Sequence, residues 1–236
     1  MLDERGARPK RHVQSQVQPR KRGQQKRSHS TRKKILEAAI ACLAELGYAA
    51  TSSSTVQARA KVSRGSLFHQ FPSKVELMLG VVDYVYEQDI EFYERALKGL
   101  RGDARAIALV RAAWQAFSSP GGMAVLQVLI GSIGDTELRD KLPSTFSRVT
   151  SRGLQQMSKS GIPRGVDQSS PPDPEFLLIR AALRGLALEA AIAPSRALIE
   201  EAVSLLAEHH ERYLKRMREP SAPAKARRAR QTLRSK

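Results

Sequence analysis

The sequence predicts an all-α protein, and three observations lead to this fold class. Apolar residues recur at helical spacing from Thr31 onward, and Ser or Thr residues stand where helix N-caps are expected. No segment combines strand alternation with hairpin turns. The 236 residues are enough for one large or two small domains. Cys42 is the only cysteine, which excludes an internal disulfide framework and favours a reducing compartment.

Positive charge is concentrated toward the two ends of the chain. The net charge is +17, of which +7 lies in residues 1–30, +5 in 31–74, zero in 75–218 and +5 in 219–236. Basic segments attract nucleic acid by releasing counterions from phosphates. They also attract anionic membrane surfaces, or act only as solubilising tails, so composition alone leaves these alternatives open. Because no apolar run approaches the roughly 18 residues of a membrane span and no signal peptide is recognised, we expect a cytoplasmic protein.

The elements can be justified in chain order. Residues 1–28 and 219–236 are basic and poor in large apolar residues, so they are predicted to be disordered. A first helix begins near Thr31, and Gly47 stands where its C-cap is expected; its apolar stripe consists of Ile35, Leu36, Ala39, Leu43 and Leu46. The cluster 51–55 supplies N-caps for a short second helix ending near Ala60.

A third short helix is expected from Ser63 to about Gln70, where Phe71-Pro72 stops it. Three helices of about 16, 8 and 8 residues, with a short turn between the last two, are typical of a helix-turn-helix, here over residues 52–71. In that motif the last helix enters the major groove of DNA. Leu67 and Phe71 are predicted to face the first helix, which leaves an outward face of Arg64, Ser66, Phe68 and His69.

A fourth helix begins with the capping-box sequence Ser73-Lys74-Val75-Glu76. Its apolar residues surround most of its circumference, so we expect it to be buried between two packed units. Further helices are predicted at about 103–118, 121–133, 135–160, 174–193 and 196–217. Pro143 is expected to break or kink the third of these, and residues 161–172 to form the longest internal loop.

Residues 29–89 resemble the DNA-binding domain of the tetracycline-repressor (TetR) family. The matching residues are Ile35-Leu36-Glu37-Ala38-Ala39, Leu46-Gly47-Tyr48, Ala50-Thr51-Ser52, Ala60, Val62-Ser63-Arg64-Gly65-Ser66-Leu67-Phe68, Phe71 and Ser73-Lys74. Residues 90–218 resemble the family only in helix number and length. Lys61 stands where the family often has glycine, in a turn that can need a positive φ, which implies about 1 kcal/mol of local strain.

The resemblance implies a set of DNA contacts and a mode of control. Thr51 would cap the second helix and touch the DNA backbone, and Lys74 would hold a phosphate at the start of the fourth helix. The remaining contacts would come from Ser63, Arg64, Ser66, Phe68 and His69. A dimer through 174–193 and 196–217 would face a pseudo-palindromic operator. Residues 90–218 would bind a small-molecule inducer that releases a repressor; candidate contacts are Tyr84, Arg111, Trp114, Gln115, Phe117, Leu126 and Ile130.

Other function classes fit the sequence less well. We expect no enzyme, because Gly131-Ser132-Ile133-Gly134 is not a nucleophile elbow and no phosphate-cradling glycine loop occurs. No cofactor or metal is expected, because His209 and His210 are adjacent on one helix and should point in different directions at a solvated helix end. The main alternative is a non-specific nucleoid or architectural DNA-binding protein, and a weaker one is membrane-surface association through the tails.

Overall fold

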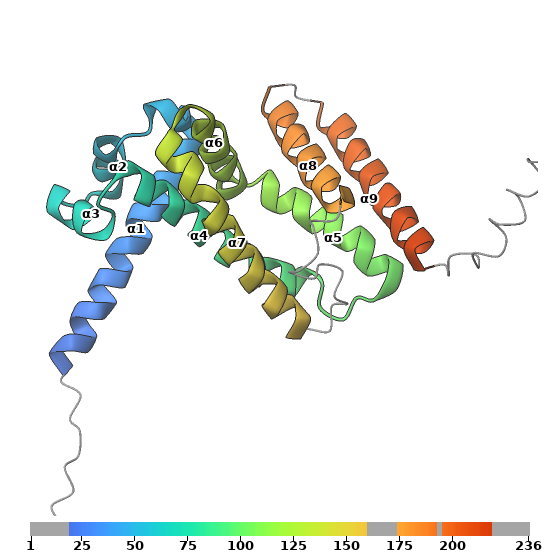
Figure 1. Ribbon diagram of the computed structural model, residues 1–236, viewed down its shortest axis with the longest axis horizontal. Helices are drawn as coiled ribbons and strands as arrows, with labels where there is room; N and C mark the ends of the chain where they lie inside the picture. The colour runs from blue at the N-terminus through green and yellow to red at the C-terminus, as the bar shows by residue number, and fades with distance from the viewer. Residues whose placement is uncertain (1–18, 160–173, 193–194, 219–236) are drawn as a thin grey trace, which may run out of the picture.

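The computed structural model describes residues 19–159, 174–192 and 195–218, and these residues form helices joined by short turns (Figure 1). No strand occurs within these ranges, which confirms the all-α prediction. The helices are α1 (Pro19–Ala50), α2 (Ser53–Ala60), α3 (Arg64–Gln70), α4 (Lys74–Ala96), α5 (Gly102–Phe117), α6 (Pro120–Gly134), α7 (Thr136–Lys159), α8 (Pro174–Ile192) and α9 (Arg196–Arg218). The predicted tail 219–236 and loop 161–172 lie outside the described residues.

Helix α1 begins earlier than the sequence analysis expected. It is helical from Pro19, so the prediction of a disordered arm over 1–28 was wrong for residues 19–28, while residues 1–18 lie outside the described residues. Part of the reason is a tertiary contact near residue 28: Gln70 Nε2 donates a hydrogen bond to Ser28 Oγ at 2.8 Å. As Figure 1 shows, the N-terminal half of α1 extends beyond the body on the side of α3.

A first hydrophobic core joins the N-terminal helices to α6 and α7. Helix α1 packs along α6, and α4 packs against α1, α6 and α7. The side chains of Ile35, Leu43, Leu77, Met78 and Val81 are fully or almost fully buried there, as are Val128 and Leu138. The expectation that α4 is buried on most sides is confirmed, because Val75, Leu77 to Val82 and Val85 are all buried. The core therefore crosses residue 89, where the sequence analysis divided the chain.

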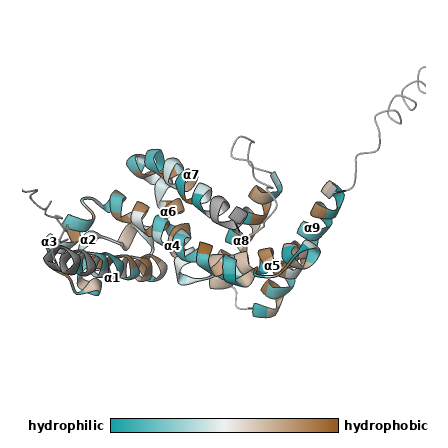
Figure 2. Cartoon of the chain, turned by 90° about the horizontal axis from the view of Figure 1, so that it is seen from below, coloured by the Kyte–Doolittle hydropathy of each residue, from teal (hydrophilic) through white to brown (hydrophobic). Residues whose placement is uncertain are grey.

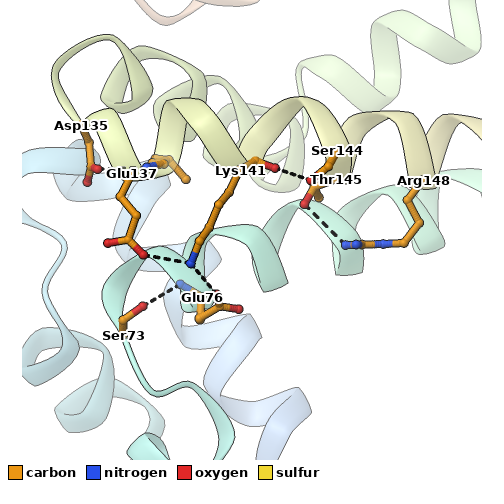
Figure 3. A network of polar contacts seen from close by, with 9 residues as sticks. Ser73, Glu76, Asp135, Glu137, Lys141, Ser144, Thr145 and Arg148 are labelled. Carbon is orange, nitrogen blue, oxygen red and sulfur yellow. Dashed lines mark hydrogen bonds and ion pairs between the residues drawn. The ribbon is translucent and has the colours of Figure 1, made fainter.

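Helices α4 and α7 run parallel and are joined by a series of ion pairs. Glu76–Lys141, Asp83–Arg148 and Glu87–Arg152 each join residues 65 positions apart, at distances of 3.1, 2.7 and 3.2 Å. Figure 3 shows the first of these contacts, in which Lys141 also binds Glu137. A constant offset along both helices requires that they run in the same direction.

Two predictions for these helices need correction. Ser73 Oγ accepts a hydrogen bond from the backbone N–H of Glu76, but the Glu76 carboxylate binds Lys141 instead of the Ser73 backbone, so the capping box is only half formed. Pro143 does not break α7, which is helical from Thr136 to Lys159. Leu138, Leu142 and Val149 are buried on the side of α4, so tertiary packing compensates for the hydrogen bond that proline removes.

Helices α5, α8 and α9 form a second, smaller core. Its buried members are Val110, Ile179, Leu183 and Ala207, with Trp114 and Phe117 packed against them. Along α8 and α9, hydrophobic and hydrophilic residues alternate (Figure 2), and many of the apolar ones remain exposed in the single chain. The exposed group consists of Phe176, Leu177, Leu178, Leu188, Ile192, Leu198 and Leu205. No single helix in the described ranges is long and apolar enough to span a membrane; α5 and α6 meet the criteria only as a pair bent by 72°.

Candidate nucleic-acid interface

Serine side chains set the start of both short helices in the motif. Ser52 caps α2 by accepting from the Thr55 backbone N–H, and Thr55 Oγ1 accepts in return from the Ser52 N–H at 2.8 Å. Ser63 caps α3 by accepting from the Ser66 N–H at 3.1 Å. Each cap satisfies backbone donors that a helix start leaves unpaired. The caps fix the angle at which α3 leaves the turn.

Thr51 does not cap α2, contrary to the prediction. Its side chain is fully buried and Oγ1 donates to the Gly47 carbonyl oxygen at 2.7 Å. Gly47 has a φ of 76°, which bends the end of α1 and turns this carbonyl toward Thr51. Of Thr51 and Ser52, only Ser52 therefore presents its hydroxyl at the start of α2.

Lys61 adopts the strained backbone that the sequence analysis expected. Its φ of 53° and ψ of 46° are left-handed, and it is the only non-glycine residue with positive φ among those described. Its backbone N–H closes the C-terminal turn of α2. The left-handed residue reverses the chain between α2 and α3, which shows that the turn geometry of a helix-turn-helix is kept without glycine.

Helix α3 has a buried face and an outward face. The side chains of Leu67 and Phe71 are at most 2% exposed and anchor the helix, as predicted. Arg64 and His69 are exposed, Phe68 is 38% exposed and Ser66 is half-buried. The Arg64 guanidinium carbon lies 5.5 Å from the centroid of the Phe68 ring. The outward face therefore presents a cation, an aromatic ring and an imidazole together.

Arg32 of α1 holds the far end of α3, a role that the sequence analysis did not predict. Its Nη1 donates to the Gln70 carbonyl oxygen at 3.4 Å, and its guanidinium lies 4.4 Å from the Phe71 ring centroid. A cation at the last carbonyls of a helix satisfies the unpaired acceptors there. Residue 32 lies on the side of the apolar stripe, three and four residues before Ile35 and Leu36, but an arginine there adds nothing to the apolar pattern, so the contact could not be read from it.

A shallow depression borders the outward face of α3. It has a volume of about 340 Å³ and is lined by α1 and α3 through Arg27, Ser28, Thr31, Gly65, Ser66, His69 and Gln70. The lining offers hydroxyl, amide, imidazole and guanidinium groups, all of which bind phosphate oxygens in protein–DNA complexes. The polar surface beside α3 thus includes α1 as well as the motif itself.

Lys74 connects the start of α4 to the end of α1. Its Nζ donates to the Tyr48 carbonyl oxygen at 3.0 Å and lies 4.1 Å from the Tyr48 ring centroid. The ammonium is half-buried, and this burial lowers the pKa of Lys74. One of its three N–H donors is committed to Tyr48, which leaves two for another acceptor.

Tyr48 extends this connection to α6 and α7. Its hydroxyl donates to Asp135 Oδ2 at 2.7 Å, and its backbone N–H donates to Gln127 Oε1 at 3.3 Å. The Tyr48 hydrogen bond, with the Leu138 N–H, holds the pKa of Asp135 below its usual range. Burial and the bond to Asp135 raise the pKa of Tyr48. Gly131 leaves room for the Tyr48 ring, because a Cβ there would overlap it. The sequence analysis missed this network.

The seven candidate ligand contacts are not gathered around one cavity. Trp114 and Phe117 pack on the second core, whereas Tyr84 packs on the first, where its hydroxyl lies 3.4 Å from Glu37 Oε1. Gln115 and Arg111 are exposed, and the latter donates to Ser204 Oγ at 3.4 Å. The other two, Leu126 and Ile130, lie on α6. A cleft of about 300 Å³ between the α3–α4 turn and α7 is lined by none of the seven.

The groups considered for catalysis or metal binding take structural positions. Cys42 is buried in the first core, and burial raises the pKa of its thiol. His209 Nε2 and His210 Nδ1 both contact the buried carboxylate of Glu175, at 3.1 and 3.4 Å. The expectation that these histidines point apart at a solvated helix end was wrong, because Glu175 of α8 lies between α8 and α9 and binds both rings. In the described part of the chain, no group of three or more candidate ligands could hold a metal ion.

Comparison with known proteins identifies the same motif. The family model of bacterial regulatory proteins of the tetR family matches residues 35–81, from the buried stripe of α1 into α4. The chain is 29% identical over 175 residues to the HTH-type transcriptional regulator CymR of Pseudomonas putida, covering 73% of this chain and 85% of that protein.

Solved structures of other proteins have a similar fold over most of this chain. A TetR transcriptional regulator from Chloroflexus aurantiacus is 26% identical with a TM-score of 0.58, covering 78% of this chain and 96% of that one. A structure described as the molecular basis for control of antibiotic production by bacterial hormones is 28% identical with a TM-score of 0.54, covering 77% and 95%. The helix-turn-helix, the helical body behind it and these relatives agree: the chain belongs to the TetR family of bacterial transcriptional regulators.

Proposed function

We propose that the protein is a repressor that binds a pseudo-palindromic operator as a homodimer and is released from it by a small molecule. The observation that supports DNA reading is that α3 has one buried face and one exposed face. Leu67 and Phe71 fix the helix to the core, and Arg64, Phe68 and His69 face outward. A short helix held in this way is of a size that the major groove of B-DNA admits.

The proposed contacts divide into base-reading and phosphate-binding groups. Arg64 can bind guanine O6 and N7 in the groove, and Phe68 can contact a thymine methyl group. Ser66 and His69 border the depression against α1, where a phosphate oxygen would meet several donors. Ser63 lies next to it, with its hydroxyl 2.9 Å from that of Ser66. Lys74 would use its remaining donors on a phosphate near the start of α4. Ser52 replaces Thr51 as the proposed backbone contact, because the Thr51 hydroxyl is fully buried.

The dimer is proposed to form through α8 and α9. These helices expose Leu177, Leu188, Ile192, Leu198 and Leu205, all more than two fifths exposed in the single chain. Burial of such a surface against a second copy is favourable by roughly 25 cal/mol per Å². A two-fold axis there would present two α3 helices to two half-sites of one operator.

We propose that residues 29–89 form the DNA-reading unit and residues 90–218 the unit for dimerisation and ligand binding. Helix α4 belongs to both, since it carries Lys74 at one end and is joined to α7 along its length. A ligand that binds better when α4 is displaced would move Lys74 and the attached α3, and the two half-sites could no longer be reached together. Such a ligand changes operator affinity only by its preference between the two positions.

Selection from a random DNA library by the full chain tests this function. We expect an inverted repeat with two half-sites about one helical turn apart, since each subunit contributes one α3. The competing function is that of a non-specific architectural DNA-binding protein, which the basic termini favour. If no motif were enriched, and if the selected DNA bound no more tightly than random DNA at the same salt concentration, the architectural alternative would be established instead.

A further inference from the structure

Two arginines of α8 lie one helical turn apart without a carboxylate partner. Residues four apart lie on the same side of a helix, which places Arg180 and Arg184 next to each other. No ion pair within the described ranges involves either guanidinium. Arg180 Nε is buried and has no hydrogen-bond partner there. Since an unpaired buried donor on a charged group is costly, this position calls for an acceptor.

Aromatic rings from three helices surround these two cations. The Arg180 guanidinium lies 5.6 Å from the ring centroid of Phe176 on α8, and that of Arg184 lies 5.4 Å from Phe117 on α5. The Arg184 guanidinium also lies near the hydroxyl of Tyr86 on α4, close enough that each group shifts the pKa of the other. The Tyr86 ring in turn meets Phe146 of α7 edge-on, with centroids 5.7 Å apart. The surroundings thus combine positive charge with apolar surface.

The arginines reach across the space between the two cores. Helix α8 packs on α5 and α9, while Tyr86 belongs to α4, which packs on α1, α5, α6 and α7. The Arg184–Tyr86 pair therefore connects α8 to the helix that carries Lys74 at its start. A group bound by the arginines would touch both units of the chain.

The charges in this region are not compensated locally. Burial and the neighbouring charge of Arg180 lower the pKa of Arg184, an effect that Tyr86 partly offsets. The carboxyl of Asp89, whose pKa burial raises to about 6, is not among the charges that act on Arg184. Its charge acts on Tyr86 and Tyr93. An added anion would relieve the repulsion between the two guanidinium groups.

We propose that Arg180 and Arg184 bind the carboxylate of a small organic acid whose apolar body lies against Phe117, Phe176 and Tyr86. A guanidinium and a carboxylate match in geometry, and Arg180 Nε supplies the free donor. This inference rests on the proposed function, for which it names the chemical class of the inducer. Through Tyr86 the bound acid would act on α4, the helix that the proposed release mechanism requires to move.

The test uses matched pairs of probes that differ in charge but hardly in shape. The full-chain protein is titrated calorimetrically with benzoate against benzamide, and with octanoate against octanamide. We expect at least one of the two acids to bind saturably and its amide to bind at least tenfold more weakly. Arg180→Met and Arg184→Met should each weaken binding of that acid at least tenfold. Methionine keeps an unbranched apolar side chain, and the circular dichroism spectrum checks the fold of each variant.

Controls separate this site from general charge and from DNA binding. Arg152→Met removes an exposed cation of α7 and should leave acid binding unchanged. Arg180→Lys keeps the charge and should retain part of the affinity. If neither acid binds better than its amide, or if binding survives in the Arg180→Met, Arg184→Met double variant, the proposal is overturned. Because calorimetry contains no DNA, absence of operator binding would reject the proposed function without touching this result.

Discussion

The core of α1, α4, α6 and α7 and the core of α5, α8 and α9 differ in how complete they are within one chain. The first encloses long stretches of α1 and α4 and anchors α3 through Leu67 and Phe71. The second buries only Val110, Ile179, Leu183 and Ala207, and it leaves much of the apolar surface of α8 and α9 exposed. The core that anchors α3 is thus complete within one chain, whereas by our proposals the other is completed by a second copy and an anionic ligand.

The largest effect is expected from breaking the proposed dimer. Leu188→Glu places a charge on the exposed apolar face of α8, where it would have to be buried against a partner. We expect a monomer in light scattering and, because the two half-sites are then bound independently, a loss of operator affinity on the order of a hundredfold or more. Ile133→Glu, at a more exposed position on α6, should leave the dimer intact. A dimeric Leu188→Glu protein would contradict the assignment of this face.

The same leucine-to-alanine substitution should lower the free energy of unfolding more in the first core than in the second. Leu77 and Leu183 are both fully buried, the first in the extended core and the second in the small one. In urea unfolding we expect Leu77→Ala to cost about 3–5 kcal/mol and Leu183→Ala about 2–3 kcal/mol, since fewer fixed neighbours let a cavity collapse. A larger cost for Leu183→Ala would show that the second core is the more rigid of the two.

Asp89, a partly buried carboxyl on α4, should make stability depend on pH. Burial raises its pKa from 3.8 to about 6, so the folded state binds a proton more tightly than the unfolded state does. Its contribution to stability is present below about pH 4 and is lost as the pH rises through 6. At pH 7.5, Asp89→Asn should therefore raise the free energy of unfolding by on the order of 1–3 kcal/mol. The gain should vanish near pH 4; a variant equally or less stable than the wild type at pH 7.5 would refute this.

The smallest effect concerns the turn of the motif. Lys61 is left-handed with a φ of 53°, a conformation that glycine adopts without a steric penalty. Lys61→Gly is expected to raise the free energy of unfolding by about 0.5–1 kcal/mol in thermal or urea denaturation. Lys98→Gly, at an exposed position without positive φ, should not stabilise the protein. Stabilisation by both variants would mean that backbone strain at Lys61 is not the cause.

Local signals in the sequence predicted much of the fold. The cap at Ser63, the stop before Pro72 and the left-handed turn at Lys61 depend on neighbouring residues, and the structure shows all three. The apolar stripe of α1 is buried from Ile35 to Leu43, but its last predicted member, Leu46, is 50% exposed. The early start of α1 could not be found this way. Its first turns have no apolar stripe, and a contact with Gln70, far away in sequence, helps to hold the region around Ser28.

Contacts between distant parts of the chain were equally hidden in the sequence. Tyr48 of α1, Lys74 of α4 and Asp135 between α6 and α7 meet, and no spacing rule relates residues 48, 74 and 135. The same holds for Arg184, Tyr86 and Phe117. Candidate ligand residues chosen for size and hydrophobicity, such as Tyr84 and Trp114, fell on different cores because aromatic residues also fill ordinary cores.

The ratio of specific to random DNA affinity in the Arg64→Ala and Phe68→Ala variants tests the central claim most directly. With the operator from library selection, at fixed salt, each variant should lower specific affinity about tenfold or more, since a lost base contact costs roughly 1–3 kcal/mol. Affinity for random DNA should change far less, and Arg139→Ala, exposed on α7, should leave both unchanged. If both variants kept the wild-type ratio, α3 would not be the helix that reads the operator.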